Sequence, residues 1–202
     1  MEDVSQCLIS CTFLASPSQG ISGDTIPNLL WRIQNGEVKT YTSLKSGVKE
    51  RMTPNPLVFW VLIGTNDLHH GDCSPEMVVL GVIRIVEELL SLEPFALVVI
   101  NGLLPRTFDQ IGGYLMETKD KQPIFWPTIE KINSHLKNYA EKRTQVSYFD
   151  AAHIFVKNYT ATDSDLRIDH NLMNDFLHPS AEGYRVWGAD IVATLDSLLP
   201  SG

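Results

Sequence analysis

The sequence LVFWVLIGTND (residues 57–67) runs from seven apolar residues into a glycine and three polar residues. An unbroken apolar run of this length is typical of a strand that is covered on both faces, as in a parallel sheet. Residues 96–100 (ALVVI) form a second such run, and residues 146–149 and 7–15 are further strand candidates. The sequence therefore predicts a sheet of buried strands, with polar groups placed where its strongest strand ends.

Helical patterns separate these runs. Apolar side chains recur at helical spacing over residues 25–36, 74–92, 127–139 and 180–198. Strands that alternate with helices predict a layered α/β domain with a parallel sheet, because each crossover has to cover a face of the sheet. We expect residues 1–202 to form a single domain, since this length fits one hydrophobic core.

The composition limits which binding partners and which cell compartment fit this sequence. The net charge of −8 argues against nucleic acid as a partner and fits small neutral or cationic substrates. No apolar run approaches the ~20 residues of a membrane-spanning helix. The three cysteines are too few for a disulfide framework, and the acidic start lacks the basic residues of a signal peptide. We therefore expect a cytoplasmic protein with no membrane span.

Three polar blocks fall where strands are expected to end, the position at which open α/β sheets gather reactive groups. In GISGDT (residues 20–25), glycine lets backbone N–H groups approach a ligand closely at the start of a helix. In GTND (residues 64–67), the amide of Asn66 can point at a developing oxyanion. In DFLHPS (residues 175–180), the aspartate can orient the imidazole of His178 and leave its other nitrogen as a base.

Each block alone also has an ordinary structural interpretation. A glycine-rich segment before a helix is usually a turn, Asn66 can satisfy loop backbone groups, and a lone histidine such as His178 often caps a helix. Short motifs predict function loosely. The catalytic interpretation therefore depends on all three blocks and on their order in the chain.

Longer stretches around these blocks resemble a known family. They are GISGDT with the following LWRIQNGE (residues 30–37), IGTN (63–66), GLLPR (102–106), and DFLH (175–178) with Gly183-Tyr184 beyond it. Together they resemble the SGNH hydrolases, also called GDSL-type esterases and lipases, and among them the catalytic subunits of brain-type platelet-activating factor acetylhydrolase. The resemblance covers roughly residues 20–200, and its last block is the most specific.

The resemblance implies a fold, a reaction and a set of site residues. The fold is a flavodoxin-like three-layer α/β/α sandwich with a parallel sheet. The reaction is the cleavage of small acyl, acetyl-like esters through a serine acyl-enzyme, with no metal and no cofactor, and the assembly is a homodimer. By the same resemblance, Gly23 and Asn66 are the oxyanion donors, His178 is the base, and Asp175 is its orienting partner.

The nucleophile of this family is not found in the sequence. It belongs to a Gly-Asp-Ser block at the end of the first strand, and no glycine precedes Gly20. Two strands of ~5 residues and a crossover of ~10–12 residues would use all of the chain before Gly23. Residues 1–22 show only one strand-like run and no helical pattern. The serines in or near this segment are poorly placed as substitutes: Ser5, Ser10, Ser16, Ser18 and Ser22.

The short N-terminus also affects the sheet. In the family's strand order the first strand lies between the second and third, so we expect residues 7–15 to fill one of two slots and the sheet to lack one N-terminal strand. Residues 1–19 are then divergent or truncated. Two functions remain open: an ester hydrolase whose nucleophile block is missing from this chain, and an inactive pseudo-hydrolase or truncated isoform that binds a ligand or a protein partner.

Residues outside the blocks have less specific interpretations. His69, His70, Asp72 and Cys73 follow the asparagine block, but their spacing matches no usual zinc pattern, so we expect an exposed loop and no metal site.

Aromatic and histidine side chains are candidates for the core or for a substrate pocket. Trp31 is expected to pack on the sheet as part of the core. The loop residues His153 and His170 fit either a substrate pocket or an ordinary loop. The segment 103–122 has no clear element, and a lid or acyl-chain pocket would lie near the aromatic residues in or close to it: Phe108, Tyr114, Phe125 and Trp126.

Overall fold

The sheet consists of three parallel strands. A computed structural model describes residues 20–38, 56–69, 73–107, 125–157 and 166–199. The strands are β1 (Val58–Val61), β2 (Leu97–Asn101) and β3 (Val146–Phe149), hydrogen-bonded in the order β1-β2-β3. Trp60 lies opposite Val99, and Ile100 lies opposite Tyr148. The strands predicted at residues 57–63, 96–100 and 146–149 are confirmed, and the strand predicted at residues 7–15 lies outside the described residues.

Helices and one small ribbon complete the described chain. The long helices are α1 (Ile26–Gln34), α4 (Pro75–Leu92), α5 (Trp126–Ala140) and α7 (Ala181–Leu198), and the short ones are α3 (Thr65–His69) and α6 (Ala152–Phe155). The strands β4 (Val156–Lys157) and β5 (Arg167–Ile168) pair antiparallel. The hydroxyls of Ser74 and Ser180 accept hydrogen bonds from the backbone three residues on, which caps α4 and α7. The four predicted long helices are confirmed.

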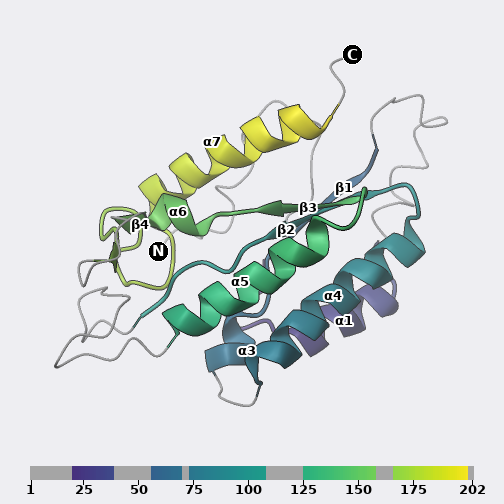
Figure 1. The fold of residues 1–202 in the computed structure, drawn as a ribbon, viewed down its shortest axis with the longest axis horizontal. Helices are drawn as coiled ribbons and strands as arrows, with labels where there is room; N and C mark the ends of the chain where they lie inside the picture. Colours follow the sequence, from purple (N-terminus) through teal and green to yellow (C-terminus); the bar gives the residue numbers. More distant parts are fainter. Residues whose placement is uncertain (1–19, 39–55, 70–72, 108–124, 158–165, 200–202) are drawn as a thin grey trace.

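The elements form three layers. Figure 1 shows α7 on one side of the sheet and α1, α4 and α5 on the other. α4 packs against β2, α5 packs against β3, and α1 lies against α4. The predicted flavodoxin-like three-layer α/β/α sandwich is confirmed. Because the strands are parallel, their carboxyl ends lie together, at the end of the sheet from which α6 and α7 start (Figure 1).

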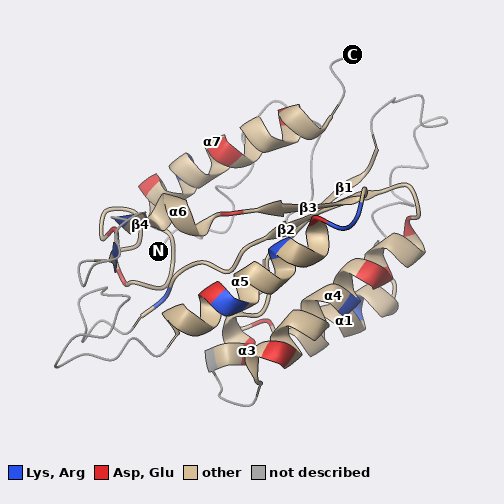
Figure 2. Ribbon diagram, viewed as in Figure 1, with Lys and Arg blue, Asp and Glu red and all other residues tan. Residues whose placement is uncertain are grey.

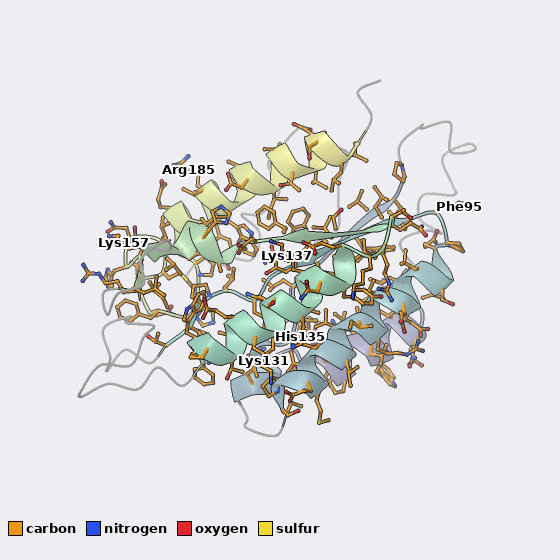
Figure 3. All side chains as sticks on the ribbon, in the orientation of Figure 1. Phe95, Lys131, His135, Lys137, Lys157 and Arg185 are labelled. Atoms are coloured by element: carbon orange, nitrogen blue, oxygen red, sulfur yellow. The ribbon has the colours of Figure 1, made fainter. Side chains whose placement is uncertain are left out.

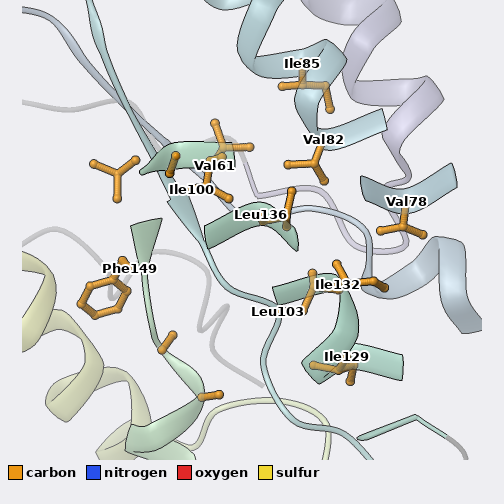
Figure 4. Packing of buried hydrophobic residues seen from close by; sticks show 14 of the residues in the cluster. Val61, Val78, Val82, Ile85, Ile100, Leu103, Ile129, Ile132, Leu136 and Phe149 are labelled. Atoms are coloured by element: carbon orange, nitrogen blue, oxygen red, sulfur yellow. The ribbon is translucent and has the colours of Figure 1, made fainter. Parts of the chain in front are cut away.

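The core lies mainly between the sheet and the α4–α5 layer (Figure 4). The α4 side chains that face the sheet are fully or nearly buried, as are those of α5: Val78, Val82, Ile85, Val86 and Leu89, then Ile129, Ile132 and Leu136. Each buried aliphatic side chain of this size contributes about 1.5–3 kcal/mol to folding. Their spacing of three and four residues is the helical pattern that predicted these helices from the sequence.

Helix α7, on the opposite side of the sheet, is hydrogen-bonded to Asn101 of β2. Asn101, at the end of β2, accepts hydrogen bonds at Oδ1 from Nε1 of Trp60 at 3.0 Å and from Nε1 of Trp187 at 3.2 Å. Trp187 belongs to α7 and Trp60 to β1, so one buried amide joins both to β2. A buried amide costs free energy unless it is hydrogen-bonded, so these bonds favour one position of α7 on the sheet.

The strongest predicted strand is less covered than its sequence suggests. Val58, Phe59 and Trp60 of β1 are half-buried, whereas residues 98–101 of β2 are all buried. Within the described residues β1 pairs only with β2. The expectation that the sheet lacks one N-terminal strand concerns residues 1–19, which lie outside the described residues.

Trp31 is not a core residue, so that expectation was wrong. Its side chain is 64% exposed, while Ile26 and Ile33 of the same helix are buried. A helix turns by about 100° per residue, so a position five residues after Ile26 faces away from it. α1 contacts α4, and Trp31 lies on another face of the helix.

Charged residues are spread over both helical layers (Figure 2). Figure 3 marks the two ends of the sheet: Phe95, which is 91% exposed in the turn before β2, stands at the amino ends of the strands, and Lys157 and Arg185 stand at the other end. None of the helices in the described ranges combines the length and apolar character needed to cross a bilayer.

Candidate active site

The structure brings Gly23 and Asn66 into one corner at the carboxyl end of β1. Asn66 Nδ2 donates a hydrogen bond to the carbonyl oxygen of Asp24 at 2.7 Å. Gly23 precedes that carbonyl by one residue and is exposed, with φ +74° in a left-handed turn. This bond uses one of the two N–H groups on Asn66 Nδ2. The two predicted oxyanion donors are therefore coupled through Asp24.

Buried acidic groups hold this corner. Both carboxylate oxygens of Asp67 lie 3.2 Å from the backbone nitrogen of Ile26, and Asp67 is only 5% exposed. The bond joins the turn after β1 to the first N–H of α1, a helix start that favours a negative partner. The relative position of Asn66 and the glycine block is thus fixed by two contacts that span more than forty residues of sequence.

An ion pair supports the same segment from α1. Arg32 donates to both carboxylate oxygens of Asp24, at 3.0 and 2.7 Å, and its Nε donates to Glu37 at 3.1 Å. The hydrogen bond with Asp24 raises the pKa of Arg32 above its usual range, although partial burial acts in the opposite direction. A bidentate guanidinium–carboxylate pair fixes orientation as well as distance, so Asp24 and its carbonyl are held firmly.

Gly64 provides the turn from β1 into this corner. Its φ is +117°, a conformation that side-chain-bearing residues rarely adopt. A Cβ at this position would also lie 2.9 Å from Cγ1 of Val78 on α4. Both the backbone angle and the packing against α4 therefore require glycine at position 64.

Asp175 and His178 form the second part of the site, in a loop before α7. Asp175 Oδ2 lies 2.7 Å from Nδ1 of the His178 ring. Asp175 Oδ1 accepts hydrogen bonds from the backbone N–H groups of His178 at 2.7 Å and Leu177 at 2.9 Å. A ring held at Nδ1 presents Nε2 as the nitrogen for proton transfer.

The loop is exposed, and its charge state follows from its hydrogen bonds. The side chains of His178 and Asp175 are 71% and 51% exposed. Partial burial alone would raise the pKa of Asp175, but the hydrogen bonds from His178 and Leu177 outweigh it and hold this pKa below its ordinary value. Between the two residues, Phe176 adopts φ +57°. The carboxylate is therefore ionised and keeps the imidazole in one orientation.

The two parts of the site lie at the same end of the sheet. Residues 106 and 107, in the loop after β2, contact both: Arg106 Nη1 donates to the carbonyl oxygen of Thr65 at 2.9 Å, and the Thr107 N–H donates to the carbonyl oxygen of Phe176 at 3.0 Å. Thr65 adjoins Asn66, and Phe176 adjoins Asp175. Sequence reasoning did not find this connection, because the partners of Arg106 and Thr107 are 41 or more residues away and leave no local pattern.

Some of the other candidate residues lie next to this arrangement, and others lie outside the described residues. His153 lies in the short helix α6 and not in a loop, with its Nε2 3.9 Å from Asp190 on α7. The His170 ring meets the Phe176 ring edge-on at 5.3 Å between centroids. Ser22 is exposed in the glycine block. The remaining serines considered as nucleophiles lie outside the described residues: Ser5, Ser10, Ser16 and Ser18.

Some of the aromatic and metal-binding candidates belong to the described residues, and others do not. Phe125 and Trp126 are buried at the start of α5, whereas Phe108 and Tyr114 lie outside the described residues. The described residues contain no group of three or more His, Cys, Asp or Glu side chains that could hold a metal ion. His70 and Asp72 are not among those residues.

The fold and the site together define a flavodoxin-like α/β domain whose polar groups gather where its parallel strands end. The sequence matches the GDSL-like Lipase/Acylhydrolase family over residues 12–186. The chain belongs to this family of hydrolases.

Curated relatives include subunits of platelet-activating factor acetylhydrolase IB. The chain is 32% identical over 165 residues to the alpha1 subunit of Rattus norvegicus and, over the same length, to the alpha2 subunit of Homo sapiens. These matches cover 82% of this chain and 56% and 57% of the two relatives. The chain thus spans little more than half the length of the relatives it matches.

Solved structures share the fold at low sequence identity. A GDSL-like lipase from Bacteroides thetaiotaomicron superposes with a TM-score of 0.63 at 18% identity, covering 90% of this chain and 75% of that one. A carbohydrate esterase family 3 protein from Talaromyces cellulolyticus gives 0.56 at 16% identity, covering 91% and 75%. At this identity the similarity establishes the fold alone.

Proposed function

We propose that this chain carries the oxyanion donors and the base of a carboxylic ester hydrolase for small acyl, acetyl-like esters. The observation that carries the proposal is the Asp175–His178 pair, which holds an exposed imidazole by Nδ1 at the same end of the sheet as Asn66. A paired histidine at the same end of the sheet as amide donors would supply the base and the oxyanion donors that acyl transfer uses.

The residues have distinct roles in the proposed reaction. Nε2 of His178 takes the proton of an attacking hydroxyl, and the Asp175 carboxylate stabilises the imidazolium that forms. The new bond between the hydroxyl oxygen and the carbonyl carbon moves charge onto the carbonyl oxygen, which the Gly23 N–H and the Asn66 amide stabilise. When the ester C–O bond breaks, His178 returns the proton to the departing alkoxide.

The attacking hydroxyl of this reaction has no assigned residue in the chain. In the acyl-enzyme mechanism that the family resemblance implies, a serine attacks first and water then releases the acyl group. The Gly-Asp-Ser block that would supply this serine is not found in the 202 residues. With the base and the oxyanion donors alone, His178 activates water directly, and the residual catalysis is weak.

The substrate and assembly belong to the same proposal. The curated relatives are named acetylhydrolase subunits, which supports a short acyl group and an assembly such as a homodimer. The net charge of −8 supports a small-molecule substrate rather than nucleic acid. We also propose that residues 1–202 form one domain and that the protein acts in the cytoplasm, without metal or cofactor.

A second candidate is a pseudo-hydrolase that binds a ligand or a protein partner. The sequence favours it in one respect: no glycine precedes Gly20, so the nucleophile block is absent from this chain. In that case the exposed imidazole and amides would serve as hydrogen-bond donors and acceptors, with no turnover.

Hydrolysis of p-nitrophenyl acetate by the 202-residue chain tests the proposal. We expect slow hydrolysis that falls at least about tenfold in His178→Ala and in Asn66→Ala, since each variant removes a group used in the transition state. His153→Ala is the matched control, because His153 also lies near an aspartate but has no role in the proposed reaction. Equal rates in all four proteins would exclude the hydrolase and favour the binding function.

A further inference from the structure

The loop GLLPRT (residues 102–107) leaves β2 toward the candidate site and is fixed at its start. Asn133 of α5 accepts a hydrogen bond from the Leu103 N–H at 2.8 Å and donates to the Leu103 carbonyl at 3.0 Å. A Cβ at Gly102 would lie 2.3 Å from the hydroxyl oxygen of Tyr148, so the backbone passes too close for a side chain. Both hydrogen bonds with Asn133 are buried, so the start of the loop is held against α5.

Arg106 contacts the Asn66 side of the site. Its Nη1 donates to the Thr65 carbonyl at 2.9 Å and lies 3.1 Å from the Thr65 hydroxyl. Its guanidinium lies over the Phe125 ring, 4.8 Å from the centroid, and the residue is only 5% exposed. Burial lowers its pKa from the usual arginine value, yet the group stays charged. A buried cation is costly unless its partners are well placed, so its position is specific.

Thr107 contacts the other side of the site. Its backbone N–H donates to the Phe176 carbonyl at 3.0 Å. Phe176 is the left-handed residue between Asp175 and His178 in an exposed loop. Thr107 is buried, so this bond ties an otherwise exposed loop to the buried part of the protein.

We propose that Arg106 and Thr107 are positioning residues that couple the Asn66 turn to the Asp175–His178 loop. Their consecutive contacts with Thr65 and Phe176 set the distance between the amide donor and the imidazole. Neither residue touches the reacting atoms. The proposal rests on the proposed function, because the proposed reaction uses the imidazole and the amide donor at a fixed separation.

The test is a hydrogen-exchange measurement by NMR on the 202-residue chain, which requires no turnover. In Arg106→Met we expect the amides of Leu177 and His178 to exchange about tenfold faster, relative to buried amides of α4 in the same sample. A milder variant, Thr65→Val, removes only the side-chain acceptor and should give a smaller change of the same sign. Arg106→Lys keeps a charged donor and should restore much of the protection.

Arg143→Met is the matched control. Arg143 also donates to a backbone carbonyl, that of Tyr139, and stacks on the Tyr139 ring. It lies between α5 and the amino end of β3, whereas both parts of the site lie at the carboxyl ends of the strands. The control should leave Leu177 and His178 unchanged relative to α4.

The proposal is overturned if Leu177 and His178 keep their relative exchange rates in Arg106→Met and Thr65→Val, or if the control changes them equally. An inactive chain that shows the expected coupling would contradict the proposed function alone. An active chain without the coupling would contradict the positioning role alone.

Discussion

The corner at Gly23 and Asn66 and the loop from Asp175 to His178 are held in different ways. In the corner, buried Asp67 accepts from the first N–H of α1, and Asn66 donates to Asp24 across 42 residues of sequence. In the loop, Asp175 accepts hydrogen bonds from the two residues that follow Phe176, and the side chains of Asp175 and His178 are more than half exposed.

The packing of elements that are distant in sequence positions the corner, whereas the Asp175–His178 pair is positioned largely by its own short segment. The corner exists only when β1, α1 and α4 are packed, so its geometry depends on the stability of the whole domain. The Asp-x-x-His segment forms its own hydrogen bonds at short range, and its contact through Thr107 sets where those groups lie. Substitutions in the corner should therefore change the stability of the whole domain. Substitutions in the loop should change the orientation and hydrogen bonding of the His178 ring.

Gly64→Ala should have the largest effect on stability. The substitution combines a backbone angle that disfavours a side chain with a Cβ 2.9 Å from Val78, so we expect a loss of about 2–4 kcal/mol. Gly23→Ala is its matched control, because no atom lies within 4 Å of the added Cβ and the loss should be only about 1–2 kcal/mol. Urea denaturation measures both, and equal losses would show that the contact with α4 contributes nothing.

Asp67→Ala should have the next largest effect. It leaves the buried Ile26 N–H without the acceptor that the structure gives it, which costs about 1–3 kcal/mol. Asp67→Asn keeps one acceptor oxygen and should lose less. If thermal denaturation finds both variants as stable as the parent, the corner is not held by this carboxylate.

Asp175→Ala should change stability by less than about 1 kcal/mol, because its partners are exposed and water can replace it. The same variant should alter the NMR signals of the His178 ring, since Nδ1 loses its partner. A stability loss as large as that of Asp67→Ala would break the distinction between the two regions.

The smallest effect is the pH dependence of the Asp175–His178 loop. The pKa of Asp175 is lower in the folded protein than in the unfolded chain, so its ionised form stabilises the fold above the ordinary aspartate value of about 4. That contribution is lost as the pH falls through the lower folded pKa. The amide signals of Leu177 and His178 should therefore stay constant down to the ordinary value and shift below it. A midpoint at or above that value would contradict the hydrogen-bond arrangement, and Asp175→Ala should show no such step.

Elements with a local pattern could be predicted from the sequence. The apolar runs in β1 and β2 and the helical spacing in α4 and α5 depend only on nearby residues, and the structure has each of them near its predicted position. Trp31 was misplaced because its environment depends on which face of α1 meets α4. That choice is made by packing and leaves no mark within the helix itself.

The contacts of the candidate site could also be predicted only where they are local in the sequence. Asp175 and His178 are three residues apart, and their hydrogen bond follows from that spacing. The links of Asp67 with Ile26 and of Arg106 with Thr65 join residues 41 apart, so no short motif encodes them. Asp67 stands next to Asn66 in the sequence, but that adjacency gave no indication of its partner.

Fluorophosphonate labelling of the purified 202-residue chain, followed by peptide mapping, tests most directly the claim that the base and the oxyanion donors are present without a serine nucleophile. His178→Ala is labelled in parallel, and circular dichroism establishes that both proteins are folded. We predict no serine whose labelling depends on His178. A labelled serine in the parent chain that is unlabelled in His178→Ala would contradict the account and would identify the nucleophile.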